Sequence, residues 1–538
     1  MKALSPKFVL TAMTVAVLAP FLDKAFHIDD PLFLWMAQQI SKHPLDPYGF
    51  DVNWTSFPQP MWMVMQNPPF CSYFIAAAAA ISGWSEVGLH LALILPAVAA
   101  VLGTYVIARR LCPNPTTAAA LTLFTPVFLV SATNLMCDVI LLACWVWSIE
   151  LWLAGLERNK AWFLAVSALL ATVAVLTKYF GIALVPLLFV YTIVRCRRLF
   201  PRVGLLFLPI AVTAAYEVWT NSHYGRALFS GAITYARISS SAHPHSLAAQ
   251  LLTGLSFAGG CLFPALFFFP KKSPKLLVAA SGAVLAMPIS FYFFGQSHPN
   301  LIAENNRAAV WIEAAIFATI GLGVMALALA DAIEARSADS ILLTLWVIGT
   351  FCFATFFNWS ITSRTILPMV PAVAILLVRR VTPVEVSTSA GILRHWRLFA
   401  AAFVSLLVTA ADYVQANSAR DAAYSFQHRF RPERATVWFQ SHWGFQYYMQ
   451  NWGAKPWNAA ASEIMSGDIM VIPLNNTAVI DIPRGKILAP EQASFATLPF
   501  ITTFGRETGA SFYSSVRGPV PWAIDSVPPE VYQFARFR

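Results

Sequence analysis

Residues 7–30 of the chain read KFVLTAMTVAVLAPFLDKAFHIDD, in which an apolar stretch at residues 8–22 is followed by two adjacent carboxylates, Asp29 and Asp30. Lysines precede the apolar stretch. Because lysines hold their end of a membrane span in the cytoplasm, the acidic pair is predicted on the outer side. Paired acids at a membrane surface are costly unless they bind a metal, hold a proton or contact a substrate, and a solvated loop is the alternative.

The composition is that of an integral membrane protein. Of 538 residues, 58% are hydrophobic and 12% are charged, whereas soluble domains carry about 25% charged residues. The net charge of +10 comes from short basic runs between apolar segments, such as Arg109-Arg110 and Arg379-Arg380. Such runs mark cytoplasmic loops, so no nucleic-acid binding is predicted. The 7 cysteines show no CxxC or metal-ligand spacing and are interpreted as apolar packing residues.

Thirteen apolar stretches are long enough to be predicted as membrane spans. They lie at residues 8–24, 88–108, 115–133, 139–156, 161–177, 179–195, 203–220, 247–269, 276–294, 308–330, 340–357, 364–378 and 398–415. A shorter apolar stretch at residues 70–82 is predicted as a juxtamembrane or re-entrant helix, because counting it as a span would place the later basic runs on the outer side. The N terminus is then cytoplasmic, and the outer loop at residues 23–87 carries further helices on the membrane surface.

The sequence therefore predicts a mostly α, polytopic membrane protein with two parts. Residues 1–415 form a bundle of about 13 spans. Residues 416–538 have mixed charge, and their apolar alternation at residues 468–473 and 477–482 predicts strands. At about 120 residues, this tail is large enough for its own core and is predicted as a small α/β domain on the outer side.

Three further ionisable residues fall on the predicted outer side at the ends of spans, namely Asp138, Lys178 and Arg364. Taken alone, Asp138 could be a helix N-cap, and Lys178 a lysine whose charge reaches the membrane surface. Arg364 begins a helix, where a cation opposes the helix dipole, which indicates an anionic partner. Together, carboxylates that can deprotonate a hydroxyl or hold a divalent cation meet cations that can bind a phosphate. A lipid phosphate is the natural phosphate at that depth, because no glycine-rich nucleotide loop is found.

Six short motifs occur in one order over residues 1–415. They are Asp29-Asp30, Asn67-Pro-Pro-Phe70, Ser85-Glu86, Asp138, Thr177-Lys178 and Arg364-Thr-Ile-Leu-Pro368. With this order the chain resembles the GT-C membrane glycosyltransferases, in particular the bacterial relatives of the dolichyl-phosphate-mannose:protein mannosyltransferases (glycosyltransferase family 39) and the lipid A aminoarabinose transferases. The resemblance implies a GT-C helical bundle as the catalytic domain, residues 1–415.

The resemblance also implies an activity and a role for each residue. The activity is inverting transfer of a hexosyl or pentosyl sugar from a polyprenyl-phosphate donor to a hydroxyl of a lipid, glycan or protein acceptor, at the outer face of the bacterial cytoplasmic membrane. Asp29 is implied as the general base, and Asp30 and Asp138 as groups that position the base, bind acceptor or hold a metal. Lys178 and Arg364 are implied to face the donor phosphate. A divalent cation, Mg²⁺ or Mn²⁺, is left open, with Asp29 and Asp138 as its ligands.

The resemblance has one important departure, and one alternative stands beside it. Aminoarabinose transferases carry an acid-lysine pair before the proline pair, whereas this chain has Gln66-Asn67, so the phosphate and metal contacts of that pair do not transfer. The alternative is a transporter or flippase of a lipid-linked saccharide. A transporter favours ionisable residues near mid-membrane and an internal repeat, and the sequence shows neither pattern.

Overall fold

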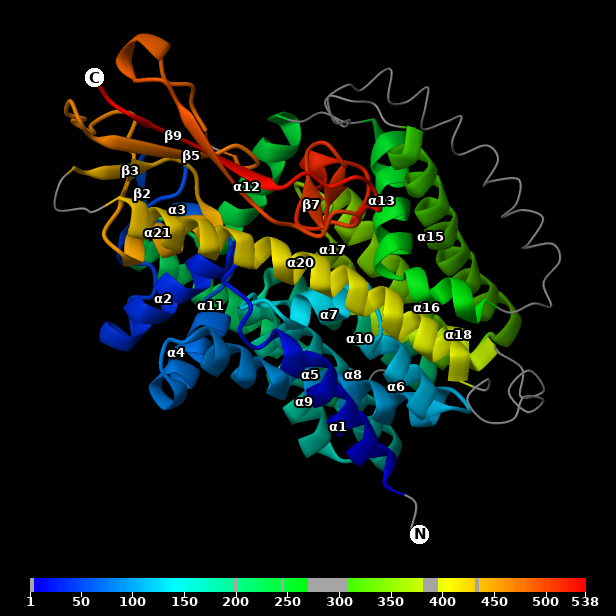
Figure 1. The fold of residues 1–538 in the computed structure, drawn as a ribbon. Coiled ribbons are helices and arrows are strands. Elements are labelled where there is room, and N and C mark those ends of the chain that lie inside the picture. Colours follow the sequence, from blue (N-terminus) through cyan, green and yellow to red (C-terminus); the bar gives the residue numbers. More distant parts are fainter. Residues whose placement is uncertain are drawn as a thin grey trace.

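A computed structural model describes residues 4–197, 201–242, 246–269, 308–380, 395–430, 435–477 and 479–538. The fold is mostly helical, with a small sheet region near the C terminus (Figure 1). Seven of the described helices are long and apolar enough to cross a membrane, or up to 8 if one bent pair counts as a single span. The span predicted at residues 276–294 lies outside the described residues.

The first half of the chain builds one side of the bundle and the loop that carries the acidic pair. Its helices are α1 (Pro6–Leu18), α2 (Asp30–Lys42), α3 (Met61–Val64), α4 (Phe70–Ser82), α5 (Glu86–Leu111), α6 (Pro115–Leu123), α7 (Pro126–Ala132), α8 (Asp138–Arg158), α9 (Ala161–Thr177), α10 (Leu184–Cys196), α11 (Phe207–Tyr224), α12 (Leu228–Ala242) and α13 (Leu247–Cys261). A two-stranded sheet of β1 (Asp51–Asn53) and β2 (Pro58–Pro60) lies between α2 and α3.

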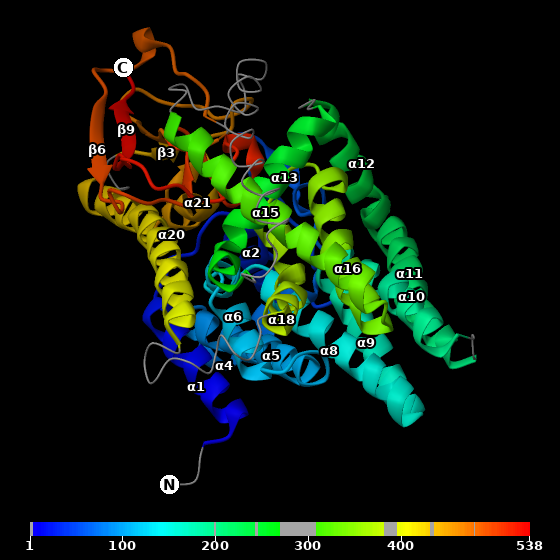
Figure 2. The same cartoon turned by 90° about the vertical axis from the view of Figure 1, so that its right-hand side faces the viewer.

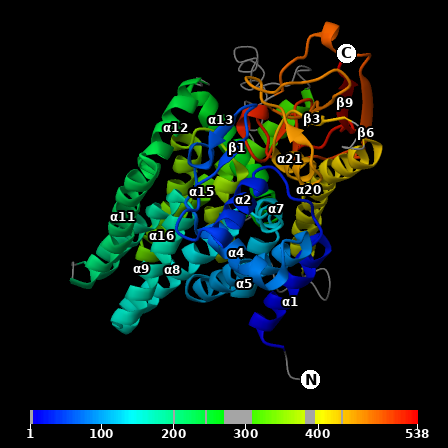
Figure 3. The same ribbon diagram turned by 90° about the vertical axis from the view of Figure 1, so that its left-hand side faces the viewer.

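The second half adds further bundle helices and then the sheet region. The helices are α15 (Ala308–Ala335), α16 (Ala338–Cys352), α17 (Ser363–Ile366), α18 (Val370–Arg380), α20 (Trp396–Arg429) and α21 (Trp443–Asn451). A five-stranded sheet has the order β4 (Lys455–Pro456), β3 (Val437–Phe439), β5 (Ile469–Pro473), β9 (Glu530–Arg536) and β6 (Glu491–Phe495), and a small pair is formed by β7 (Phe504–Gly505) and β8 (Ala510–Ser511). The N terminus and this sheet region lie at opposite ends of the molecule (Figures 1, 2 and 3).

Local chemistry explains two helix boundaries that matter for the site. The short helix predicted at residues 70–82 is α4, which follows Pro69 and ends at Gly83, where a φ of 74° favours glycine. The span predicted at residues 115–133 is broken into α6 and α7, which meet at 62°. Pro126 begins α7, and proline cannot donate the backbone hydrogen bond that would continue α6.

Helix α20 joins the bundle to the sheet region. It is 34 residues long, and it packs on α6 and α7 in the bundle and on α21, β6 and β9 in the sheet region (Figure 1). The helix passes the predicted domain boundary at residues 415–416 without a break. Phe426 near its C-terminal end is buried against Tyr532 and Phe534 of β9, so this helix lies in the hydrophobic core of both parts.

One of the two strands predicted in the tail forms and the other does not. Residues 468–473 give β5, which is hydrogen-bonded on both edges, to β3 and to β9. Residues 479–482 form no strand. The backbone N–H and C=O of Ile480 are instead hydrogen-bonded to the side-chain amide of Gln440, at 2.6 and 2.9 Å. A glutamine side chain therefore takes the place of a neighbouring strand for this segment.

Candidate functional site

Asp29 stands at the start of α2 with its side chain one third exposed. It occupies the N-cap position, but its carboxylate makes no capping hydrogen bond to the helix. Its Oδ2 instead accepts a hydrogen bond from Nη2 of Arg364 at 3.0 Å. Because the carboxylate is not used by its own helix and keeps an open side, it can meet a substrate hydroxyl.

Asp30 is turned the other way and is fully buried. Its Oδ2 accepts the backbone N–H of His27 at 2.8 Å, and its Oδ1 accepts the backbone N–H of Leu135, between α7 and α8, at 2.9 Å. Burial raises the pKa of Asp30 to about 7, against the opposing effects of the His27 N–H and the charge of Lys24. Asp30 thus connects the acidic loop to the α7–α8 turn. The backbone between His27 and Asp30 is strained, since Ile28 has a φ of 45°.

Asp138 and Lys178 form a close ion pair. Asp138 lies in the first turn of α8 and is buried, and its Oδ1 accepts from Nζ of Lys178 at 2.7 Å. Lys178 directly follows the last residue of α9, and its side chain is 19% exposed. It therefore pairs with Asp138 inside the protein and does not extend to the membrane surface. The N-cap position of α8 belongs to Cys137. The simpler interpretations of Asp138 as a cap and Lys178 as a surface lysine are therefore not what the structure shows.

Arg364 connects the two carboxylates. It lies in α17, its Nη2 donates to Asp29, and its Nη1 is 3.7 Å from Oδ2 of Asp138. Its guanidinium carbon is 5.6 Å from the ring centroid of Tyr513, in the C-terminal region. Asp29, Arg364, Asp138 and Lys178 thus form one alternating line of charges, which we call the charged row. Each residue of the row comes from a different segment, and each lies at or beside a helix terminus.

A second group of polar residues, which sequence reasoning missed, lies buried beside the charged row. Lys24 and Asp412 form an ion pair at 2.5 Å with both side chains fully buried. Lys24 also donates to Oδ1 of Asn134 at 2.7 Å, and Tyr513 donates to both oxygens of Asp412, at 2.9 and 3.0 Å. We call these four residues the buried network. Asp412 carried a usable signal, because a carboxylate inside an apolar segment is a functional-site hypothesis by default.

Two aromatic side chains, Tyr235 and Trp359, were missed as well. Tyr235 of α12 is partly exposed, and its ring packs on Trp359 with 6.0 Å between the centroids. Burial raises the pKa of Tyr235, and the negative charge of Asp29 raises it further. Both residues stand in segments predicted as outer loops, where aromatic residues gave no distinct signal.

The side chains around Asp29 and Asp138 do not favour a divalent cation between these two carboxylates. Both carboxylates contact Arg364, and Asp138 also holds Lys178. Over the described ranges, no three His, Cys, Asp or Glu side chains come together in a way that could hold a metal ion. Oδ2 of Asp138 is a buried oxygen without a hydrogen-bond partner, but two cations already surround that carboxylate.

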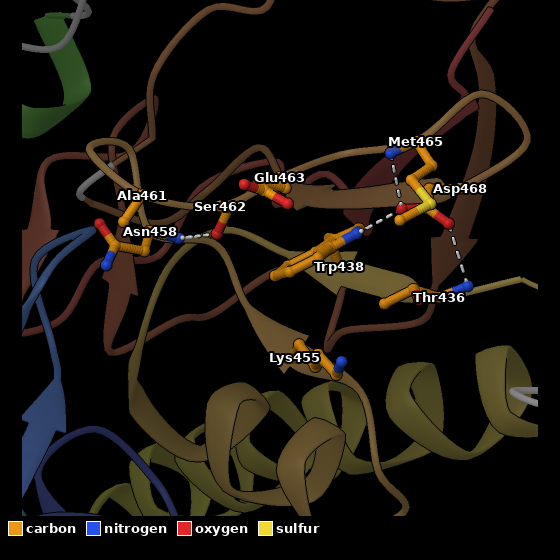
Figure 4. A pocket seen from close by; sticks show the side chains of 9 residues that line it. All are labelled: Thr436, Trp438, Lys455, Asn458, Ala461, Ser462, Glu463, Met465 and Asp468. Atoms are coloured by element: carbon orange, nitrogen blue, oxygen red, sulfur yellow. Dashed lines mark hydrogen bonds between the residues drawn. The ribbon is translucent and has the colours of Figure 1, made fainter.

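A hollow of about 400 Å³ lies elsewhere, in the C-terminal sheet region (Figure 4). Trp438, Lys455 and Asp468 are among its lining residues. The Asp468 carboxylate accepts from Nε1 of Trp438 and from the backbone N–H groups of Thr436 and Met465, so it serves the local fold. No member of the charged row lines this hollow.

Comparison with protein families shows a match to part of the chain. Residues 66–219 match the family described as dolichyl-phosphate-mannose-protein mannosyltransferase. This segment contains α4, Asp138 and Lys178. The predicted resemblance to the dolichyl-phosphate-mannose:protein mannosyltransferases is thereby confirmed over this segment. A search of curated proteins finds no match to the chain.

Several solved structures show distant likeness to most of the chain. ArnT from Cupriavidus metallidurans in the apo state is 16% identical over 87% of this chain and 92% of that one, with a TM-score of 0.42. The same protein bound to undecaprenyl phosphate is 15% identical over 87% of this chain and 93% of that one, with a TM-score of 0.41. The Archaeoglobus fulgidus oligosaccharyltransferase in complex with Zn and sulfate is 12% identical over 87% and 68% of the two chains, with a TM-score of 0.45. Residue roles do not transfer at this distance, so the assignments for this chain rest on its own geometry.

Proposed function

We propose that the protein is an inverting glycosyltransferase that moves a sugar from a polyprenyl-phosphate donor to an acceptor hydroxyl. The observation that carries the proposal is the charged row, in which one partly exposed carboxylate stands next to two cations and a buried carboxylate. The family match over residues 66–219 supports the class of reaction. The acceptor is a lipid, a glycan or a protein hydroxyl.

Each member of the charged row has a role in this reaction. Asp29 takes the proton of the acceptor hydroxyl, because it is the most accessible carboxylate of the row. The hydroxyl oxygen forms a bond to the anomeric carbon as the bond from that carbon to the phosphate oxygen breaks. The electron pair leaves with the phosphate, whose growing charge Lys178 and Arg364 stabilise. Inversion follows from a single displacement with the acceptor, carbon and phosphate in line.

The carboxylates that do not act as the base hold the others in place. Asp138 contacts both cations and so orients them toward one phosphate. Asp30 fixes the loop on which Asp29 stands, through the two backbone N–H groups it accepts. Positioning of this kind matters, because displacing reacting groups by about 1 Å can cost on the order of 100-fold in rate.

We place this chemistry at the outer face of the bacterial cytoplasmic membrane, with a cytoplasmic N terminus. The lysines before the first apolar stretch support this orientation. The charged row lies at helix termini, and the sheet region lies at the end of the molecule opposite the N terminus (Figure 3). Residues 1–415 would form the catalytic part and residues 416–538 the outer part, joined by α20.

Replacing Lys178 by Gln is expected to lower sugar transfer by about 100-fold, because one cation that stabilises the leaving phosphate is lost. The measurement is mass analysis of envelope glycans, lipids and glycoproteins from cells that lack the protein and carry either variant or wild type. The matched control is Lys42→Gln, an exposed lysine in the last turn of α2. The modification is expected to disappear with Lys178→Gln and to persist with the control. Loss of the modification together with accumulation of a lipid-linked saccharide on the cytoplasmic side would favour a transporter instead.

Removal of divalent cations is expected to leave transfer unchanged, because Arg364 already pairs with both carboxylates that could bind an ion. The purified protein is assayed in lipid vesicles with and without excess EDTA. A loss of activity that Mg²⁺ or Mn²⁺ restores would show instead that an ion takes the place of Arg364 between Asp29 and Asp138.

A further inference from the structure

The backbone directly before Arg364 is held by the C-terminal region. The N–H of Ser363 donates to the carbonyl of Phe512 at 2.9 Å. The N–H of Ser515 donates to the carbonyl of Ile361 at 2.8 Å, and the N–H of Ile361 donates to Oγ of Ser515 at 3.0 Å. A segment far along the chain therefore sets the position at which α17 begins, since Ile361 and Ser515 are separated by 154 residues in the sequence.

The same C-terminal segment supplies the surface on which the Arg364 side chain lies. Tyr513, which is buried, presents its ring to the guanidinium at 5.6 Å. A guanidinium packed by its face on an aromatic ring keeps its edge N–H groups free for an oxyanion. In Arg364 those edges point to Asp29 and Asp138. The Tyr513 ring thus supports the guanidinium of Arg364 while its N–H groups face the two carboxylates.

The buried network fixes the ring in turn. The Tyr513 hydroxyl donates to Asp412 and accepts from Nδ2 of Asn134 at 3.0 Å. Asp412 is held by Lys24 and by the hydroxyl of Thr503, at 2.5 and 2.7 Å. Asn134 precedes Leu135, whose N–H binds Asp30. The hydroxyl of Tyr513 is therefore held by hydrogen bonds to Asp412 and Asn134, which we call the clamp, and its ring packs on Arg364.

We propose that Tyr513, clamped by Asp412, is a positioning residue for Arg364, and that the C-terminal region is thereby part of the transferase site. This inference rests on the proposed function, because Arg364 is taken to bind the donor phosphate. The membrane part of the enzyme is then incomplete without the C-terminal region, which supplies Tyr513 to the site.

The test is binding of undecaprenyl phosphate to the full-length protein in lipid nanodiscs. Tyr513→Leu is expected to weaken binding about tenfold, because Arg364 loses the ring that orients it. Tyr513→Phe keeps the ring but loses the clamp and is expected to weaken binding about threefold. The matched control is Tyr532→Phe, a buried tyrosine of β9 that packs on Phe445 and Phe495, and it is expected to bind as wild type.

A double-mutant cycle separates positioning from general loss of structure. In protein that already carries Arg364→Gln, Tyr513→Leu is expected to cause no further loss of binding, because the group it positions is gone. Equal losses with and without Arg364 would overturn the inference, as would wild-type affinity for Tyr513→Leu. If the Leu variant does not fold, Tyr513→Phe is measured in the same two backgrounds with the same two outcomes.

The wild-type measurement distinguishes this inference from the function on which it rests. If wild-type protein does not bind undecaprenyl phosphate, the proposed donor class is wrong and the inference falls with it. If wild type binds and Arg364→Gln weakens binding, the function stands, and the Tyr513 cycle alone decides the inference.

Discussion

Asp29→Asn is expected to reduce sugar transfer by about 10²- to 10⁴-fold, the usual contribution of a general base. Asparagine has the shape of aspartate but cannot accept the proton of the acceptor hydroxyl. The fold is expected to survive, because Asp29 is one third exposed and Arg364 keeps Asp138 as an anionic partner in the variant. Transfer is measured by mass spectrometry of the acceptor after reconstitution into lipid vesicles, and folding by thermal unfolding.

Asp51→Asn provides the control for this experiment, since Asp51 is an exposed aspartate on β1 in the same outer loop. It is expected to transfer sugar at the wild-type rate. Normal turnover by Asp29→Asn would remove Asp29 from the role of base. Loss of activity accompanied by loss of thermal stability would instead show that Asp29 acts through the fold.

Lys24→Met is expected to destabilise the protein by about 3–5 kcal/mol, the largest effect on stability that the structure predicts. Lys24 and Asp412 are both fully buried and 2.5 Å apart, so the variant leaves a buried carboxylate without its cation. The measurement is thermal unfolding of the purified protein in detergent. The control is Lys7→Met at the exposed start of α1, which is expected to unfold at the wild-type temperature.

Removing both charges together gives a second test of the same pair. The double variant Lys24→Met with Asp412→Leu is expected to regain most of the lost stability, because no uncompensated charge remains buried. The hydroxyls of Thr503 and Tyr513 still lose their acceptor, so recovery is incomplete. Wild-type stability of Lys24→Met would show that Asp412 is held by its other partners.

The charged row could be assembled from the sequence because its members occupy the ends of spans. Basic residues between apolar stretches assign each span end to one side of the membrane, and this places Asp29, Asp138, Lys178 and Arg364 together. The common location of these four residues can therefore be predicted without knowing how the helices pack. The short helix at residues 70–82 was predictable for a similar reason, since prolines precede it and glycine follows it.

Side-chain direction and distant contacts could not be predicted in this way. Asp30 is next to Asp29 in the sequence, yet it turns to backbone N–H groups, one of them at Leu135, which only the folded α7–α8 turn brings near. Lys24 meets Asp412 across a sequence separation of 388. The strand predicted at residues 477–482 failed because Gln440 satisfies the Ile480 backbone, and apolar alternation carries no information about such a side chain.

The position of Tyr513 after the bundle helices in the sequence has a consequence for biosynthesis. The helices of the bundle leave the ribosome and enter the membrane before residues 503–517 are translated. Until then Arg364 lacks the ring on which it lies, and Asp412 lacks the hydroxyls of Thr503 and Tyr513. If the proposed function holds, the nascent chain is therefore a membrane protein before it can act as a transferase, because activity requires that residues 503–517 have been translated.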